Sequence, residues 1–267
     1  MDARIARYLK QLGELGAPDL YLEHVSRADA LALASGASGA GGGHQRTRAE
    51  TVGDAVDDVA STMASTAALS PLLLAPVASP EQIGMLRTLG EQAAVCTRCR
   101  LHETRRNVVF GVGNAGADLV IVGEAPGQEE DRTGKPFVGR AGKLLDLLLM
   151  SVGFPREQVY ICNVLKCRPP GNRNPLPDEV DPCTRNFLFA QLDVIAPRVL
   201  LAVGRFAVQA LLGTTEAVGR LRGRIHVYRG TPLVVSYHPA YLLRSPNLMR
   251  SAWTDYQLVR TVLDEQP

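Results

Sequence analysis

The stretch DLVIVGEAPGQEEDRTGKPFVG, residues 118–139, carries the most information about the fold of this 267-residue chain. It opens with a short apolar run, residues 118–123, whose length and β-branched composition are typical of a buried strand. A polar segment marked by glycine and proline follows directly, so the strand ends at a tight backbone turn. We therefore predict a central strand whose carboxyl end leads into a loop with charged groups.

Outward from this strand, short apolar runs alternate with longer helical patterns. Further strands are predicted at residues 159–165, 199–204 and 233–237, and helices at residues 142–152, 178–196, 205–212 and 248–263. Strands separated by helices need right-handed crossovers, which give parallel neighbours covered on both faces. The sequence thus predicts an α/β fold, a three-layer α/β/α sandwich around a mainly parallel four-stranded sheet.

Composition divides the chain into three parts. Residues 1–34 begin with apolar side chains at three- and four-residue spacings, which predicts an N-terminal helical segment. Residues 35–80 are rich in Ala, Gly, Ser and Thr, and predict a flexible linker. Residues 81–267 carry the alternating pattern and form the predicted main domain.

The chain has no apolar run of membrane-spanning length, and its start is charged and amphipathic. We expect a cytoplasmic protein without a membrane partner, in which disulfides are rare. The net charge of +2 hides an asymmetry, because residues 1–90 carry −3 and residues 91–267 carry +5, with arginine the main cation. The basic part is expected to meet an anionic partner, although an ordinary solvated surface fits the charge equally well.

Four of the five cysteines have the spacing of a metal site. Cys96 and Cys99 form a C-x2-C pair, while Cys167 and Cys183 frame a loop rich in Pro, Gly and Asn. Such a set suits either tetrahedral zinc or a cubane iron–sulfur cluster, and spacing does not separate the two. The fifth, Cys162, lies within an apolar run and is interpreted as a small buried side chain.

Polar segments follow three predicted strands, and parallel strands bring their carboxyl ends to one edge. These segments begin at residues 123, 163 and 238. Phosphate binding by the first fits poorly, because it lacks the G-x-x-x-x-G-K-[ST] pattern and carries three consecutive acidic residues. Carboxylates, an aromatic ring, an amide and an imidazole on one rim better describe a pocket for a flat, polar, neutral ring.

Three motifs carry a family resemblance: GEAPGQEEDRTGKPFVG, NVLKCRPPGNRNPLPDE and YHPAYLLR. Together with the four cysteines they resemble the family 4 uracil-DNA glycosylases, the iron–sulfur branch of the uracil-DNA glycosylase superfamily. The resemblance covers about residues 95–262 and makes residues 81–267 the catalytic domain. It implies base excision repair, in which the N-glycosidic bond of uracil in DNA is hydrolysed.

The resemblance also implies the cofactor and the base pocket. Cys96, Cys99, Cys167 and Cys183 would hold a [4Fe–4S] cluster. Uracil would be bound by residues from all three motifs, namely Gly123, Glu124, Ala125, Phe137, Asn163 and His238.

Within the implied pocket, Glu124 would crowd the ring C5 and exclude the thymine methyl, and Phe137 would stack on the flipped base. Asn163 would read the O4 and N3 edge. His238 would lie near O2, where negative charge grows as the bond breaks. Glu130, the third member of the implied catalytic set with Asn163 and His238, would orient water or steady the cationic sugar.

The resemblance further implies how DNA is engaged. Tyr241, Leu242, Leu243 and Arg244 would form a loop that enters the duplex, with an apolar wedge and an arginine at the phosphate or the orphaned partner base. The expected partner is uracil-containing DNA, single- or double-stranded, at the nucleoid of a bacterium. We expect a monomer, and residues 1–90 could tether it to a repair or replication partner.

Other functional interpretations within the same fold have less support from the sequence. A branch that captures uracil-DNA covalently uses a histidine in an insertion after the second motif, and this chain has no insertion there; residues 223–226, GRIH, echo it only superficially. A branch with broader base specificity lacks an acidic residue in the first motif, where this chain has Glu130. A noncatalytic module of the same fold is disfavoured by the intact set of Glu130, Asn163 and His238.

Overall fold

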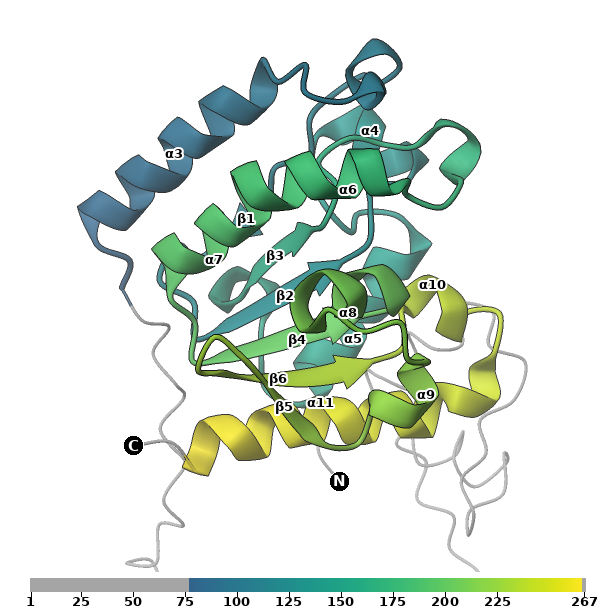
Figure 1. Ribbon diagram of the computed structural model, residues 1–267. Helices are drawn as coiled ribbons and strands as arrows, with labels where there is room; N and C mark the ends of the chain where they lie inside the picture. Colours follow the sequence, from purple (N-terminus) through teal and green to yellow (C-terminus); the bar gives the residue numbers. More distant parts are fainter. Residues whose placement is uncertain (1–76, 266–267) are drawn as a thin grey trace, which may run out of the picture. The chain divides into compact units, whose positions relative to one another are not determined.

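The computed structural model describes residues 77–265, which are drawn in colour in Figure 1. The predicted N-terminal helical segment, residues 1–34, lies outside the described residues, as does the predicted linker up to residue 76. Within residues 77–265, no helix is both long and apolar enough to cross a membrane.

A mixed sheet of six strands forms the centre of the described region. The strands are β1 (Val112–Gly113), β2 (Leu119–Gly123), β3 (Tyr160–Asn163), β4 (Val199–Val203), β5 (Ile225–Tyr228) and β6 (Thr231–Ser236). Their order across the sheet is β1-β3-β2-β4-β6-β5, and the four central strands are parallel. The α/β class is confirmed, but the prediction of four strands was wrong, because an antiparallel strand borders each edge.

The two edge strands lack the sequence pattern of a buried strand, each for a different physical reason. β1 has only two residues, and its Gly113 has a φ of +131°. A Cβ on Gly113 would lie 2.0 Å from the Val159 carbonyl oxygen, so the chains pair only because glycine has no side chain. In β5, Ile225 and Val227 are exposed, so the strand lacks the buried run that marks the central strands.

The central strands match their predicted positions because burial on both faces selects continuous apolar runs. All residues of β2 and β4 are buried, and so is Cys162 in the middle of β3, as the sequence predicted. The register pairs Val122 with Cys162 and Gly123 with Asn163. Gly123 and Asn163, which belong to two of the motifs, therefore lie next to each other at the ends of neighbouring strands.

Helices cover both faces of the sheet (Figure 1). The helices longer than one turn are α3 (Pro80–Ala94), α4 (Gln128–Thr133), α5 (Arg140–Ser151), α6 (Pro177–Cys183), α7 (Phe189–Ile195), α8 (Arg205–Leu212) and α11 (Met249–Glu265). Side chains of α3, α7 and α8 form one core with alternate residues of the sheet. On the other face α11 packs on β4 and β6 and contacts α5.

The predicted helices are present, with one internal difference. Residues 178–196 were expected as one helix, but a π-helix, η5 (Thr184–Leu188), separates α6 from α7. It begins directly after Cys183, and π turns concentrate at functional sites. Helix α3 was not predicted, although Ser79 and Gln82 form a capping box at its start.

A buried ion pair fixes α11 to the sheet. Both oxygens of Asp255 accept hydrogen bonds from the Arg222 guanidinium, at 2.8 and 3.0 Å, and one also accepts from Ser236 Oγ at 2.9 Å. The backbone N–H of Gly223 donates to the same carboxylate. Asp255 is fully buried, so its removal would leave the Ser236 hydroxyl without its acceptor and the largely buried Arg222 guanidinium without its counterion.

We predict that Asp255→Ala lowers the free energy of unfolding by about 3–5 kcal/mol, the usual cost of breaking a buried pair. Asp264→Ala is the matched control, because Asp264 pairs with Arg260 on the exposed side of the same helix and should cost less than about 1 kcal/mol. Urea unfolding of the full chain measures both. Equal losses in the two variants would contradict the assignment.

Candidate active site

The base of the candidate pocket lies where β2 and β3 end. A Cβ added to Gly123 would lie 2.4 Å from Asn163 Oδ1 and 2.6 Å from Phe137 Cζ. Only glycine therefore fits at this position, since the two neighbours approach the backbone directly. Three residues predicted from two separate motifs are in mutual proximity.

Asn163 presents an unused acceptor in this pocket. The residue is 1% exposed, and its Oδ1 has no hydrogen-bond partner within the described residues. A buried acceptor without a partner costs about 1–3 kcal/mol, so this site is suited to a ligand that brings an N–H group.

Phe137 closes the pocket in a constrained conformation. Its φ is 50°, in the left-handed region that non-glycine residues rarely adopt. A Cβ on Gly142 would lie 1.9 Å from the Phe137 carbonyl oxygen, so the first turn of α5 packs against this backbone. The Phe137 ring stacks on His238 with centroids 5.5 Å apart and an interplanar angle of 29°. The backbone conformation of Phe137 and the contact of its ring with His238 therefore both restrict the position of the ring.

Glu130, on α4, is held by backbone donors. Its Oε1 accepts from the N–H groups of Val138 at 2.9 Å and Gly139 at 3.0 Å, and its Oε2 accepts from Gly127 at 3.1 Å. These bonds anchor the segment that follows Phe137. The sequence suggested only a chemical role for this carboxylate, whereas the structure also gives it a structural one.

His238 begins α10 (Pro239–Leu242) and is oriented by that helix. Its Nδ1 accepts a hydrogen bond from the Ala240 N–H at 3.1 Å, which leaves the proton of the neutral ring on Nε2. Burial lowers the pKa of His238 to about 4; Arg244 lowers it further, and Glu130 opposes the shift. The ring is therefore a neutral donor at neutral pH.

The remaining predicted pocket residues lie at the same edge of the sheet. Glu124 follows β2, and its carbonyl oxygen accepts from the Leu165 N–H at 3.0 Å. Partial burial raises the pKa of Glu124, while the nearby Arg205 guanidinium lowers it. Ala125 packs against the apolar cluster that contains Cys167.

The predicted DNA loop is divided by burial. Tyr241 is 43% exposed and Arg244 is exposed, but Leu242 is fully buried. Leu242 therefore belongs to the core and anchors α10, whereas Leu243 is half-buried. Tyr237, the first residue of the third motif but not one of the predicted site residues, lies against Tyr241 with ring centroids 5.7 Å apart.

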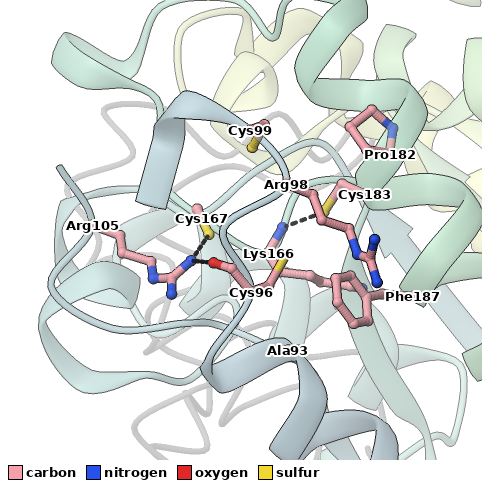
Figure 2. Close-up of a pocket in the computed structure, with 10 residues that line it drawn as sticks. All are labelled: Ala93, Cys96, Arg98, Cys99, Arg105, Lys166, Cys167, Pro182, Cys183 and Phe187. Carbon is pink, nitrogen blue, oxygen red and sulfur yellow. Dashed lines mark hydrogen bonds between the residues drawn. The ribbon is translucent and has the colours of Figure 1, made fainter. Parts of the chain in front are cut away.

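The four predicted metal ligands line one cavity of about 310 Å³, including its opening to solvent (Figure 2). Cys96 and Cys99 come from the segment after α3, Cys167 follows β3, and Cys183 ends α6. All four are free thiols. Three segments distant in sequence are thus brought together around one set of sulfurs.

The donor set consists of four thiols from three chain segments around one cavity. Thiolates are the ligands of cubane iron–sulfur clusters and also of structural zinc sites. The chemistry of these four residues therefore fits an iron–sulfur cluster.

Cationic groups surround these sulfurs. Arg105 Nη1 donates to the Cys96 carbonyl oxygen at 2.8 Å and to Cys167 Sγ at 3.4 Å. The backbone N–H of Lys166 donates to Cys183 Sγ at 3.3 Å, as Figure 2 shows. Burial raises the pKa of the Cys183 thiol to about 12, and Lys166 opposes that shift. Such donors stabilise thiolates when a metal displaces their protons.

Several of these supporting residues were not found from the sequence. Gly142 is an ordinary helix residue by pattern, and its need for glycine comes from the contact with Phe137. Arg105 and Lys166 stand among many basic residues, so nothing in composition marks them. Lys166 does adjoin Cys167 within a motif, which was the available signal.

His226, the histidine of the GRIH sequence, lies away from this site. It is on the edge strand β5, and its Nε2 bonds the Leu221 carbonyl oxygen at 2.7 Å. This bond holds the His226 ring at the edge of the sheet, so the ring is not among the residues of the site described above.

A cluster of a glycine, an aromatic ring, an amide and a histidine at the carboxyl edge of such a sheet agrees with the family comparison. Residues 110–257 match the model of the uracil DNA glycosylase superfamily. The chain belongs to this superfamily.

The curated relatives identify the branch. Over 172 residues the chain is 44% identical to a type-4 uracil-DNA glycosylase of Archaeoglobus fulgidus, covering 61% of this chain and 86% of the relative. Over 186 residues it is 43% identical to that of Thermotoga maritima, covering 68% and 96%. A type-5 uracil-DNA glycosylase of Pyrobaculum aerophilum reaches 34% over 148 residues, covering 49% and 64%. The predicted type-4 resemblance is confirmed.

The neutral state of His238 predicts how stability depends on pH. Its pKa is about 4 in the folded chain against 6.5 for an unperturbed histidine, so between these values the unfolded state binds more protons. The free energy of unfolding should therefore rise with pH through this window and fall on acidification. Denaturant unfolding at several pH values should show a smaller slope for His238→Gln.

His226→Gln is the matched control for this measurement, because it removes an imidazole outside the pocket. The slope that depends on His238 should remain in that variant. An unchanged slope in His238→Gln would contradict the neutral assignment.

Proposed function

We propose that this chain removes uracil from DNA by hydrolysing the N-glycosidic bond, in the base excision repair of deaminated cytosine. The observation that carries the proposal is the unpartnered Oδ1 of Asn163, buried beside Phe137 and the backbone of Gly123. Family membership and the type-4 relatives support the same activity.

Uracil fits the polarity of the pocket. Its N3–H would donate to the free Asn163 Oδ1, and the amide nitrogen of the same side chain would donate to O4. The Phe137 ring provides a stacking face for a base turned out of the helix. Gly123, Glu124 and Ala125 would line the edge near C5, where Glu124 would exclude the thymine methyl.

His238 would stabilise the charge that develops on the leaving base. As the N1–C1′ bond breaks, its electron pair moves into the uracil ring, and negative charge accumulates at O2. The Nε2–H of neutral His238 would donate to that oxygen, and a preorganised donor of this kind is typically worth about 3 kcal/mol.

Glu130 would act on the sugar. Its carboxylate is close enough to influence His238 electrostatically, and a negative charge there stabilises an oxocarbenium-like sugar. Its backbone bonds restrict rotation, so the orientation of water is a secondary role for this residue. Water adds its oxygen to C1′, and the products are an abasic site and, after proton transfer, free uracil.

DNA would be engaged at the same rim. Tyr241 and Leu243 would fill the space left by the base, and Arg244 would meet a phosphate or the orphaned partner base. The proposal includes single- and double-stranded substrates, a monomer in the cytoplasm, and a partner contact through residues 1–90. It also treats residues 81–267 as the catalytic domain.

The cofactor of the proposal is a [4Fe–4S] cluster held by Cys96, Cys99, Cys167 and Cys183. The four free thiols around one cavity support it, and so does the type-4 name of the relatives. When bound, the cluster would cross-link three chain segments, and hydrolysis requires no electron transfer from it. It therefore stabilises the loop behind Asn163.

We predict that the purified chain excises uracil, but not thymine, from labelled oligonucleotides, so alkali cleaves only the uracil strand. Asn163→Asp should lower kcat/KM for uracil roughly 5- to 150-fold. The new carboxylate oxygen would face uracil O4, and one buried acceptor opposite another costs about 1–3 kcal/mol. Affinity for undamaged DNA should be retained and should fall steeply with salt.

Asn114→Asp is the matched control, because Asn114 lies beyond β1 near the amino end of β3, where its Oδ1 accepts from Gly116. It should keep full activity. The absence of uracil-dependent breaks would reject the proposal, and a stable protein–DNA adduct would indicate covalent capture instead.

We predict that Cys167→Ala loses the brown colour, the iron and the acid-labile sulfide of the purified protein, because one of four ligands is removed. Cys162→Ala should retain all three, since Cys162 is buried within β3 and does not line the cavity. Iron and sulfide analysis of the two variants decides the point. Zinc without iron in the wild type would refute the cluster.

A further inference from the structure

Lys166 is a lysine without access to solvent. It is 1% exposed, and it lies at the end of β3 between the pocket and the cysteine cavity, which it also lines. Lysine is rarely buried unless its donors are satisfied, so its contacts define its role.

The side-chain nitrogen of Lys166 reaches back to the strand that carries Asn163. Its Nζ donates to the main-chain oxygen of Asn163 at 2.7 Å and to Gln191 Oε1 at 2.5 Å. Gln191 is itself fully buried and donates through Nε2 to Tyr160 OH and to the Phe110 carbonyl oxygen, each at 3.0 Å. The lysine thus belongs to a polar network with named partners on three segments.

The main chain of Lys166 is tied to the cysteine cavity. Its N–H donates to Cys183 Sγ, its carbonyl oxygen accepts from the Val109 N–H at 2.8 Å, and the next residue is Cys167. One residue therefore holds the cavity with its backbone and the pocket strand with its side chain.

The connection to the pocket is short and rigid. Only three residues separate Asn163 from Cys167, and the first two of them extend the pairing with β2. Val164 N–H donates to the Gly123 carbonyl oxygen, and Leu165 N–H to that of Glu124, both at 3.0 Å. The position of the Asn163 backbone is therefore linked to the sulfurs by this short segment and by the side chain of Lys166, which spans it.

We infer that Lys166 is a positioning residue that couples the cysteine cavity to the uracil-reading amide of Asn163. This inference rests on the proposed function and deepens it. Lys166 touches no substrate; it fixes the Asn163 carbonyl, and with it the direction of the unpartnered Oδ1. Base recognition therefore depends on the integrity of the cavity through this one side chain.

The test replaces Lys166 by Met, which keeps the length of the stem and removes the donor. Small misplacements at a reacting site cost up to about 100-fold. We expect KM for a uracil oligonucleotide and the inhibition constant of free uracil to rise about 10- to 100-fold, with kcat changed less. Iron per chain and the midpoint of thermal unfolding are measured on the same samples.

A second variant addresses a failure of Lys166→Met to fold. Lys166→Met combined with Gln191→Leu removes the side-chain donor and its side-chain acceptor together, so Gln191 Oε1 is not left unpaired, although the Gln191 Nε2 bonds to Tyr160 and Phe110 are lost as well. The control is Arg87→Met on the exposed face of α3, a cation-to-Met change at a side chain that is 77% exposed. The control should match the wild type in every measurement.

The outcomes separate this inference from the proposed function. Weakened uracil affinity at unchanged iron content supports positioning by Lys166. If KM and free-uracil inhibition stay at wild-type values per iron-containing molecule while stability falls, Lys166 is only structural and the inference is overturned. If the wild type itself excises no uracil, the proposed function fails first.

Discussion

The parallel pairing of β2 with β3 is the constraint on which the site depends. Because Gly123 pairs with Asn163 across these strands, the backbone that ends one strand lies against the amide that ends the other. A shift of one residue would turn Asn163 to the opposite face of the sheet. All residues of β2 are buried, so an element that packs in the core also places the residues at its end.

The pocket combines groups whose charge states are set by their surroundings. Asn163 is neutral and lacks one partner, His238 is kept neutral by burial, and Glu130 brings a carboxylate held by three backbone donors. The leaving base gains negative charge while the sugar gains positive charge. In the proposed reaction, neutral His238 at the base and the fixed Glu130 carboxylate near the sugar would match that charge separation without a change in side-chain position.

The central strands and most helices could be predicted from the sequence because each buries a continuous or periodic apolar face. β1 and β5 could not, since a two-residue strand and a half-exposed edge leave no such pattern. Helix α3 carried an interpretable signal in Ser79 and Gln82. For the site, motifs supplied Asn163 and His238, but the burial of Leu242, the backbone bonds of Glu130 and the network of Lys166 depend on tertiary contacts that a single sequence does not contain.

The left-handed backbone of Phe137 has a consequence for selectivity. Its conformation is held by Gly142 behind it and by the bonds to Glu130 beside it, and the opposite wall is the bare backbone of Gly123. Backbone atoms cannot move aside as a rotatable side chain can, so a change of rotamer cannot make room for a base that is slightly too large. If the proposed uracil site lies here, its backbone walls are already fixed, and little conformational entropy would be lost when the base binds.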